Sequence, residues 1–154
     1  MLVILLYIQK EEVVMTKSEI LEFINANPVF HLATIEGDRP RVRGMLLYRA
    51  DENGILFHTG KMRDLHKQLT VNPLVEMSFN NGSSEDLMQV RISGRLELVE
   101  DTELKKEIVQ KREFLKPFVE HYGYDPLAVY RLEKGIASVW AMRTNLAPKS
   151  YVEI

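Results

Sequence analysis

The chain has 154 residues, a mass of 17.9 kDa and a formal net charge of −2 at pH 7, which suits one domain of ordinary size. Proteins whose main task is to bind nucleic acid or a membrane surface present a basic face, so this balance argues against both partners. The sequence has no cysteine, which excludes disulfides and cysteine-based zinc sites and is compatible with a reducing cytoplasm.

The N-terminal segment opens on a short apolar run that ends at Gln9 and Lys10. A membrane span needs about 20 apolar residues, so this run is too short to cross a bilayer. It also lacks the basic start and the small-residue cleavage site of a signal peptide. Because Met15 directly precedes a helix-start pattern, we expect residues 1–14 to be an extension or the product of an alternative start. Residues 15–154 are expected to form a single domain.

The first half of the chain is expected to form a helix, three strands and a second helix, over about 17–26, 29–35, 39–50, 55–59 and 61–71. Thr16 and Glu19 form a capping box before the first helix. The turn dipeptide Gly37-Asp38 joins the first two strands into a hairpin.

The second half is expected to hold two strands, a charged helix, a segment that is helical in pieces and a last strand, over about 74–79, 87–99, 101–116, 117–133 and 135–142. Gly94 interrupts the long strand, and a glycine at such a place often marks a bulge or a barrel corner. The pattern therefore predicts about six strands, mostly antiparallel. A sheet of this size in so short a chain closes into a barrel or buries its edges against a partner.

Two basic segments are candidates for a binding site. Arg39, Arg41 and Arg43 alternate along a strand, so their guanidinium groups share one face, which a solvated surface explains more simply when taken alone. Lys61 and Arg63 follow a strand end and are expected in the first turn of a helix. Cations there are unfavourable unless an anion is bound, so together the two segments predict a phosphate-binding site.

The remaining chemistry-bearing residues give weaker indications. His31, His58, His66 and His121 do not have the spacing of metal ligands, so no metal site is predicted. His58 stands at a strand end, where it can border a ligand ring. Trp140 fits a core, a ring-stacking or a dimer-interface position equally well. No nucleophile or nucleotide-loop motif occurs, so in an enzyme the cofactor would carry the chemistry, and we assign no catalytic residue.

In their order along the chain, several segments resemble the pyridoxamine 5′-phosphate oxidase-like, FMN-binding split-barrel family, with a likeness that extends over about 30–152. The segments are FHLATI at 30–35, PRVR at 40–43, FHT at 57–59, KQL at 67–69 with NP at 72–73, and QVRISGRLE at 89–97. The resemblance implies a mainly β fold, a six-stranded antiparallel split barrel with peripheral helices. It also implies a homodimer with two sites for flavin mononucleotide (FMN) at the interface.

Carried onto this sequence, the resemblance implies ten cofactor-binding residues, namely Arg43, Gly44, Met45, Leu46, His58, Thr59, Lys61, Arg63, Gln89 and Trp140. Lys61 and Arg63 would bind the flavin phosphate, and Arg43 would contact the phosphate or the ribityl chain. Gln89 would reach the flavin from the neighbouring subunit, and Trp140 would border its ring.

The sequence departs from the vitamin B6 oxidase at its substrate motif. The oxidase has an R-x-H motif shortly after its tryptophan, which residues 143–148 lack, and Asp64 and Leu65 replace a basic pair. The end of the chain is more similar to general-stress and nitroimidazole-resistance relatives. We therefore expect a cytoplasmic, FMN-dependent oxidoreductase that passes electrons from a reduced nicotinamide to a small-molecule oxidant. The alternatives are a non-enzymatic FMN- or haem-binding storage or sensor module and a reductase that uses the deazaflavin F420.

Overall fold

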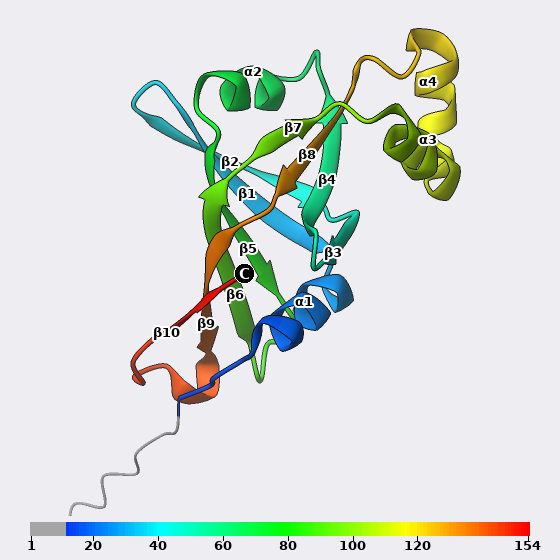
Figure 1. Cartoon of the computed structure of the whole chain (residues 1–154). Helices are drawn as coiled ribbons and strands as arrows, with labels where there is room; N and C mark the ends of the chain where they lie inside the picture. Colours follow the sequence, from blue (N-terminus) through cyan, green and yellow to red (C-terminus); the bar gives the residue numbers. More distant parts are fainter. Residues whose placement is uncertain (1–11) are drawn as a thin grey trace, which may run out of the picture.

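The computed structural model describes residues 12–154, so most of the predicted extension lies outside the described residues. The described chain folds into two antiparallel β-sheets around a main hydrophobic core, with four α-helices outside them and two smaller apolar clusters (Figure 1). The strands are β1 (Val29–Glu36), β2 (Arg39–Leu46), β3 (Arg49–Asp51), β4 (Gly54–Gly60), β5 (Leu74–Asn80), β6 (Met88–Arg95), β7 (Glu97–Val99), β8 (Leu127–Leu132), β9 (Gly135–Ala141) and β10 (Ser150–Glu153). The helices are α1 (Lys17–Ala26), α2 (Asp64–Val71), α3 (Thr102–Lys111) and α4 (Lys116–Tyr122), with short 3-10 turns η1 (Glu113–Leu115) and η2 (Met142–Thr144).

The predicted six-stranded antiparallel sheet is confirmed, with the order β10-β9-β6-β5-β1-β2, and a second sheet has the order β3-β4-β8-β7. Aromatic packing joins the two sheets. Phe30 of β1 stacks on Phe79 of β5 with ring centroids 4.8 Å apart and meets Phe57 of β4 edge-on at 5.7 Å. All three side chains are completely buried, so this cluster forms the centre of the barrel.

Two expected strands each divide into two where the chain passes from one sheet to the other. The segment over 39–50 breaks after β2, where Leu47 N–H donates to Pro28 and Tyr48 N–H donates to Leu56. The segment over 87–99 breaks between β6 and β7. Gly94 lies just before that corner, and a Cβ there would be 2.8 Å from the backbone oxygen of Lys134. The close approach of the neighbouring turn therefore requires glycine at this position.

The helical segments match the sequence pattern only in part. The first helix and its capping box are confirmed. The expected helix over 61–71 begins only at Asp64, and the charged helix over 101–116 ends at Lys111. The prediction of helical pieces over 117–133 is wrong beyond α4, because Gly123 (φ 76°) ends that helix and residues 127–132 form β8 at the centre of the second sheet. The C-terminal tail adds β10 to the first sheet.

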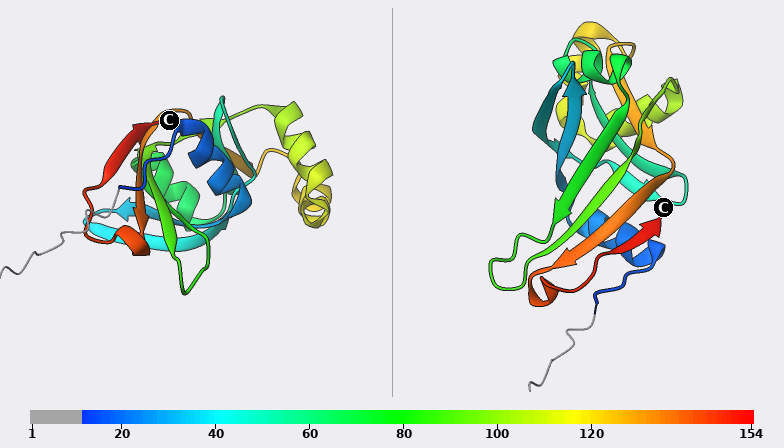
Figure 2. Two further views of the ribbon diagram at one scale, coloured as in Figure 1. Left: turned by 90° about the horizontal axis from the view of Figure 1, so that it is seen from below. Right: turned by 90° about the vertical axis from the view of Figure 1, so that its left-hand side faces the viewer.

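The helices lie at different places around the barrel. Figure 2 shows α1 and α2 at opposite ends of the barrel in its right-hand view, and α3 with α4 projecting from one side in its left-hand view. Among residues 12–154, no helix is long and apolar enough to cross a bilayer.

Candidate functional site

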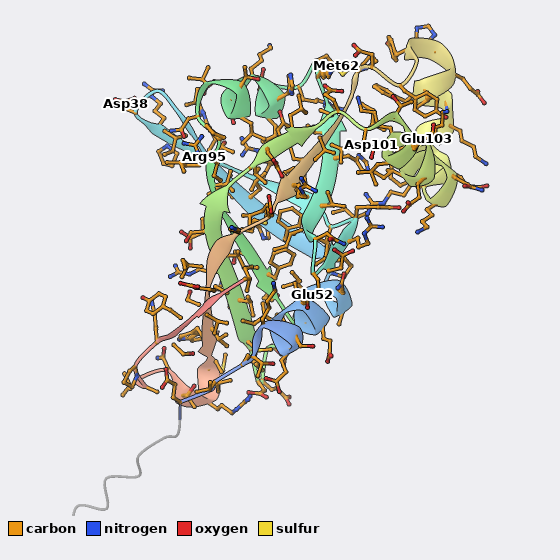
Figure 3. All side chains as sticks on the ribbon, in the orientation of Figure 1. Asp38, Glu52, Met62, Arg95, Asp101 and Glu103 are labelled. Carbon is orange, nitrogen blue, oxygen red and sulfur yellow. The ribbon has the colours of Figure 1, made fainter. Side chains whose placement is uncertain are left out.

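A cleft of about 1070 Å³ is bordered by β2, the end of β4, the turn into α2, and α4. Six of the ten predicted cofactor-binding residues line it, namely Arg43, Gly44, Met45, His58, Thr59 and Arg63. In Figure 3, Met62 marks the turn between β4 and α2 at the top of the molecule, and Asp38 marks the tip of the β1–β2 hairpin. The cleft thus draws its lining from segments on both sides of the barrel opening.

Arg43 is held by a small polar network under the cleft. Its guanidinium donates to the hydroxyl of Thr34 at 2.7 Å and to the side-chain oxygen of Gln68 at 2.5 Å. Thr34 in turn donates to Gln68 at 2.6 Å, and both of these side chains are buried. Burial, followed by the charge of Arg41, lowers the pKa of Arg43, but a guanidinium stays protonated at neutral pH. The cation is therefore fixed in position by neutral partners that leave its charge available.

Arg63 and Lys61 have different surroundings. Arg63 is the N-cap residue of α2, lines the cleft and makes no side-chain capping bond. None of the ion pairs formed by residues 12–154 involves it. Lys61 does not line the cleft, since its ammonium lies 2.9 Å from Glu100 and 3.3 Å from Asp125, which raise its pKa.

The expectation that Lys61 and Arg63 occupy the first helical turn is therefore wrong. Gly60 accepts the N–H of Arg63 in a tight turn, so the helix starts only afterwards. Asp64 occupies the first turn instead, as the helix dipole favours. Arg63 nevertheless stays at the helix N-terminus, and it lines the cleft together with Asp64 and Leu65 of the first turn, where the N–H groups of a helix are free.

His58 is a neutral side chain whose proton position is fixed. Its Nε2 lies 2.7 Å from a guanidinium nitrogen of Arg112, which also donates to the carbonyl of Leu47. A guanidinium has donors only, so Nε2 accepts and the hydrogen of the ring is on Nδ1. Burial, and then the charge of Arg112, lowers the pKa of His58 to about 4. Arg112 is 54 residues away along the chain, and no local pattern points to it.

The two ends of the cleft differ in polarity. At the α4 end the lining is apolar, with Leu115, Phe118 and Tyr122, and the rings of the last two are 5.2 Å apart. Towards the β1–β2 hairpin the lining carries Arg43 and an Arg41–Glu36 ion pair of 2.6 Å, and Arg63 lines the cleft at the turn between β4 and α2. The cleft thus offers cations to an anionic group of a ligand and an apolar wall to a ring.

The remaining predicted residues are placed elsewhere in the single chain. Gln89 and Trp140 pair across β6 and β9 and line a separate hollow of about 320 Å³ with Arg91, Ser138 and Lys149. The indole N–H of Trp140 donates to Asn145 at 2.9 Å. Leu46 is 42% exposed at the end of β2. Within residues 12–154 no cluster of three or more histidine or carboxylate side chains is placed to hold a metal ion.

Comparisons with known proteins agree on one family. The model of the family described as pyridoxamine 5′-phosphate oxidase matches residues 16–133. A pyridoxine/pyridoxamine 5′-phosphate oxidase of Pseudomonas putida is 42% identical over 69 residues, which are 44% of this chain. The matched segment spans only 31% of that relative's own length.

Solved structures share the fold over nearly the whole chain. A NimC/NimA family protein from Clostridium acetobutylicum superposes with a TM-score of 0.71 and 26% identity, over 89% of this chain and 92% of its own. An FAD-binding protein from Mesorhizobium loti has a TM-score of 0.62 and 18% identity, over 82% of this chain and 95% of its own. A heme binding protein from Mycobacterium smegmatis has a TM-score of 0.64 and 16% identity, over 90% of this chain and 58% of its own. The last two identities are low enough that these likenesses show the fold alone.

Proposed function

Because the chain belongs to the pyridoxamine 5′-phosphate oxidase family, we propose that it binds FMN in the cleft and passes electrons from a reduced nicotinamide to a small-molecule oxidant. The observation that carries this proposal is the pair of guanidinium groups, of Arg43 and Arg63, that line the cleft. Arg63 has no acidic partner among the described residues, and the partners of Arg43 are uncharged.

The charged end of the cleft fits a flavin phosphate. A phosphate dianion is best held by fixed cations and by free N–H groups at a helix N-terminus. Arg43 and Arg63 supply the cations, and the first turn of α2 supplies the N–H groups. Thr59 adds a hydroxyl at the same side of the opening. These residues would hold the cofactor by its phosphate.

The rest of the cleft fits a planar ring. A Cβ at Gly44 would meet nothing within 4 Å, so the strand leaves open space where a ring can lie against the backbone. A bound flavin supplies two-electron chemistry, by which a hydride lost from the nicotinamide reaches the oxidant as two electrons and a proton. The chain's own part is to orient the ring against the backbone at Gly44 and the side chain of Met45 and to keep water from its face.

We also propose that the protein is a homodimer paired through the outer face of the six-stranded sheet. Large apolar side chains are more than 40% exposed on the strands of this sheet, namely Val29, Ile35, Val42, Leu46, Leu74 and Ile136. Such patches commonly mark an interface. Gln89 and Trp140 belong to the same sheet, so a partner would bring them towards the cleft of the first chain.

The dimer is tested by sedimentation of the purified protein, which should give twice the mass of one chain. Val42→Lys with Leu46→Glu should yield monomers, whereas Leu146→Glu, at a residue that is 92% exposed, should leave the dimer intact. A wild-type protein that sediments as a monomer contradicts this part of the proposal.

The cofactor is tested by the visible spectrum and by quenching of FMN fluorescence on titration with protein. We expect a yellow protein, and Arg63→Ala should bind FMN about ten- to a hundredfold more weakly, since one charge-assisted hydrogen bond is lost. Arg39→Ala, which removes an exposed cation outside the cleft, is the matched control. A colourless protein that leaves FMN fluorescence unchanged would reject the proposal.

The same measurements separate the alternatives. A sharp Soret band would identify haem, and preferential binding of F420 over FMN would identify the deazaflavin. Flavin bound without turnover of any nicotinamide would leave a storage or sensor role. The cytoplasm is the compartment that we propose, since the absence of cysteine suits a reducing environment.

A further inference from the structure

The α4 end of the cleft holds a hydrogen-bond donor that the binding of a phosphate does not use. His58 lines the cleft, and its Nε2 is occupied by the bond from Arg112. The other ring nitrogen, Nδ1, has no protein partner among residues 12–154, and it is not among their buried unpaired atoms. The N–H at Nδ1 is therefore open to a ligand in the cleft.

Arg112 gives this donor its direction. The guanidinium is anchored on the carbonyl of Leu47 and lies 5.3 Å from the ring centroid of Tyr48. It thus arrives at His58 from the C-terminus of α3 with little freedom to turn. Since arginine can only donate, the arrangement excludes the other neutral tautomer of His58.

The surroundings of this donor are apolar on the α4 side. Phe118 and Tyr122 are the residues of α4 that line the cleft, and Leu115 precedes them. Tyr122 is 56% exposed and Met62 is 50% exposed, so large apolar side chains stand at the opening without cover from the rest of the described chain. Exposed side chains of this kind at a hollow indicate a binding surface for an apolar ligand.

We propose that this end of the cleft binds a neutral, planar ring compound that carries a carbonyl-type acceptor, to which His58 donates from Nδ1 with Arg112 as its positioning residue. The inference rests on the proposed function, because such a compound would be the oxidant that receives the electrons. It assigns a chemical class to that oxidant.

The lining of the cleft explains why the ligand should be neutral and why it should carry a hydrogen-bond acceptor. A charged ligand would lose its hydration against Phe118 and Leu115, which offer it no counter-ion. A ring without an acceptor would bury the N–H of His58 unpaired, which is costly. A neutral ring with a carbonyl oxygen avoids both penalties.

The first test reads the tautomer of His58 by ¹⁵N NMR on protein with no cofactor added. We expect a proton-bearing Nδ1 and a bare Nε2 near neutral pH. Arg112→Met should leave His58 with mixed tautomers, whereas Lys116→Met, which removes an exposed cation of α4, should not change them. A wild-type His58 protonated on Nε2 would overturn the inference.

The second test compares menadione with 2-methylnaphthalene, which has the same carbon skeleton but no carbonyl group. The chain has no cysteine for the quinone to alkylate, so binding can be followed cleanly by chemical-shift titration. We expect menadione to bind about five- to tenfold more tightly, as one hydrogen bond predicts. His58→Phe should abolish this preference, and His58→Asn, whose amide N–H can replace Nδ1–H, should keep part of it.

The two tests distinguish this inference from the proposed function. Normal FMN quenching with equal affinity for both probes would reject the inference alone. No FMN quenching, together with the expected tautomer and a menadione preference lost in His58→Phe, would reject the flavin and leave the ring subsite standing. A His58→Phe variant with wild-type thermal stability and an unchanged preference for menadione would also overturn the subsite.

Discussion

Arg43 on β2 and Gln68 on α2 are joined by a hydrogen bond of 2.5 Å from the guanidinium to the side-chain oxygen. This bond links the hairpin wall of the cleft to the helix beside it. Because the partner is a neutral amide, the guanidinium is oriented without being neutralised, and its full charge remains for a phosphate. Gln68 is therefore expected to influence a bound phosphate through Arg43.

We predict that Gln68→Glu will fold normally but will bind FMN about tenfold more weakly, because a carboxylate neutralises Arg43 and repels the phosphate. Gln68→Leu, in contrast, should lower the free energy of unfolding by about 1–3 kcal/mol, since Thr34 and Arg43 lose their shared acceptor. Urea denaturation and FMN titration measure the two effects. An unchanged FMN affinity in Gln68→Glu would mean that Arg43 does not face the phosphate.

Lys61 and Arg63 are expected to differ when each is replaced alone. Lys61→Ala removes two ion pairs with partly exposed carboxylates, so the unfolding free energy should fall by less than about 1 kcal/mol and FMN affinity should hardly change. Arg63→Ala should leave the unfolding free energy almost unchanged and should weaken FMN binding. FMN titration in low and high salt checks both variants. A larger loss of affinity in Lys61→Ala would place the phosphate on the other side of the turn.

The stability of the protein should fall as the pH is lowered from 7 towards 4, in part through His58. Its pKa is about 4 in the folded chain and ordinarily higher in an unfolded one, so the unfolded state takes up the proton first. This contribution should amount to about 2–3 kcal/mol at the acid end of the window. It is present above the unfolded pKa and is lost as the pH falls through the folded one.

Carboxylates with lowered pKa values, such as Glu100 and Glu107, also lose stabilising contacts in acid, so the comparison must be between variants. The difference in unfolding free energy between pH 7 and pH 4.5 should be smaller in His58→Asn than in the wild type. His121→Gln, on the exposed face of α4, should retain the wild-type difference. If the unfolding free energy depended on pH equally in the wild type and in His58→Asn, the lowered pKa of His58 would be refuted.

Two glycine substitutions should separate fold from site. Gly94→Ala places a Cβ 2.8 Å from the Lys134 backbone oxygen and 2.9 Å from Leu132, so we expect a loss of about 2 kcal/mol in stability. Gly44→Ala meets nothing within 4 Å and should cost less than about 0.5 kcal/mol. Gly44 lines the cleft, however, and its variant should bind FMN more weakly. Thermal unfolding and FMN titration on the same preparations test this contrast.

The sequence was most informative where structure is decided locally. The helix over 17–26 was predicted with both of its ends, because the capping box at Thr16 and the stop at Asn27-Pro28 depend on neighbours in the chain. The hairpin at Gly37 follows from the same kind of information. Gly94 pointed to the corner after β6. The corner after β2 could not be predicted, because the alternating pattern continues across it and only the pairing partners differ.

The sequence did not reveal β8 or the residues that contact the site residues, and the reason is a different one. A continuous apolar run such as residues 127–132 is compatible with a buried strand or a buried helix, and only its neighbours in the sheet decide. Arg43 and Arg63 were identified as candidates from their strand and turn positions. Gln68 and Arg112, which orient Arg43 and His58, reach the site only through tertiary packing.

The ammonium of Lys61 contacts Glu100, which precedes α3, and Asp125, which follows α4. One side chain of the barrel thus contacts the helical segment near both of its ends. We expect sequence changes inside this segment to alter the choice of ligand, because Leu115, Phe118 and Tyr122 line the cleft, while Arg43 and Arg63, which lie outside it, stay unchanged. Grafting the segment that holds α3 and α4 between relatives is therefore expected to transfer ligand preference together with it.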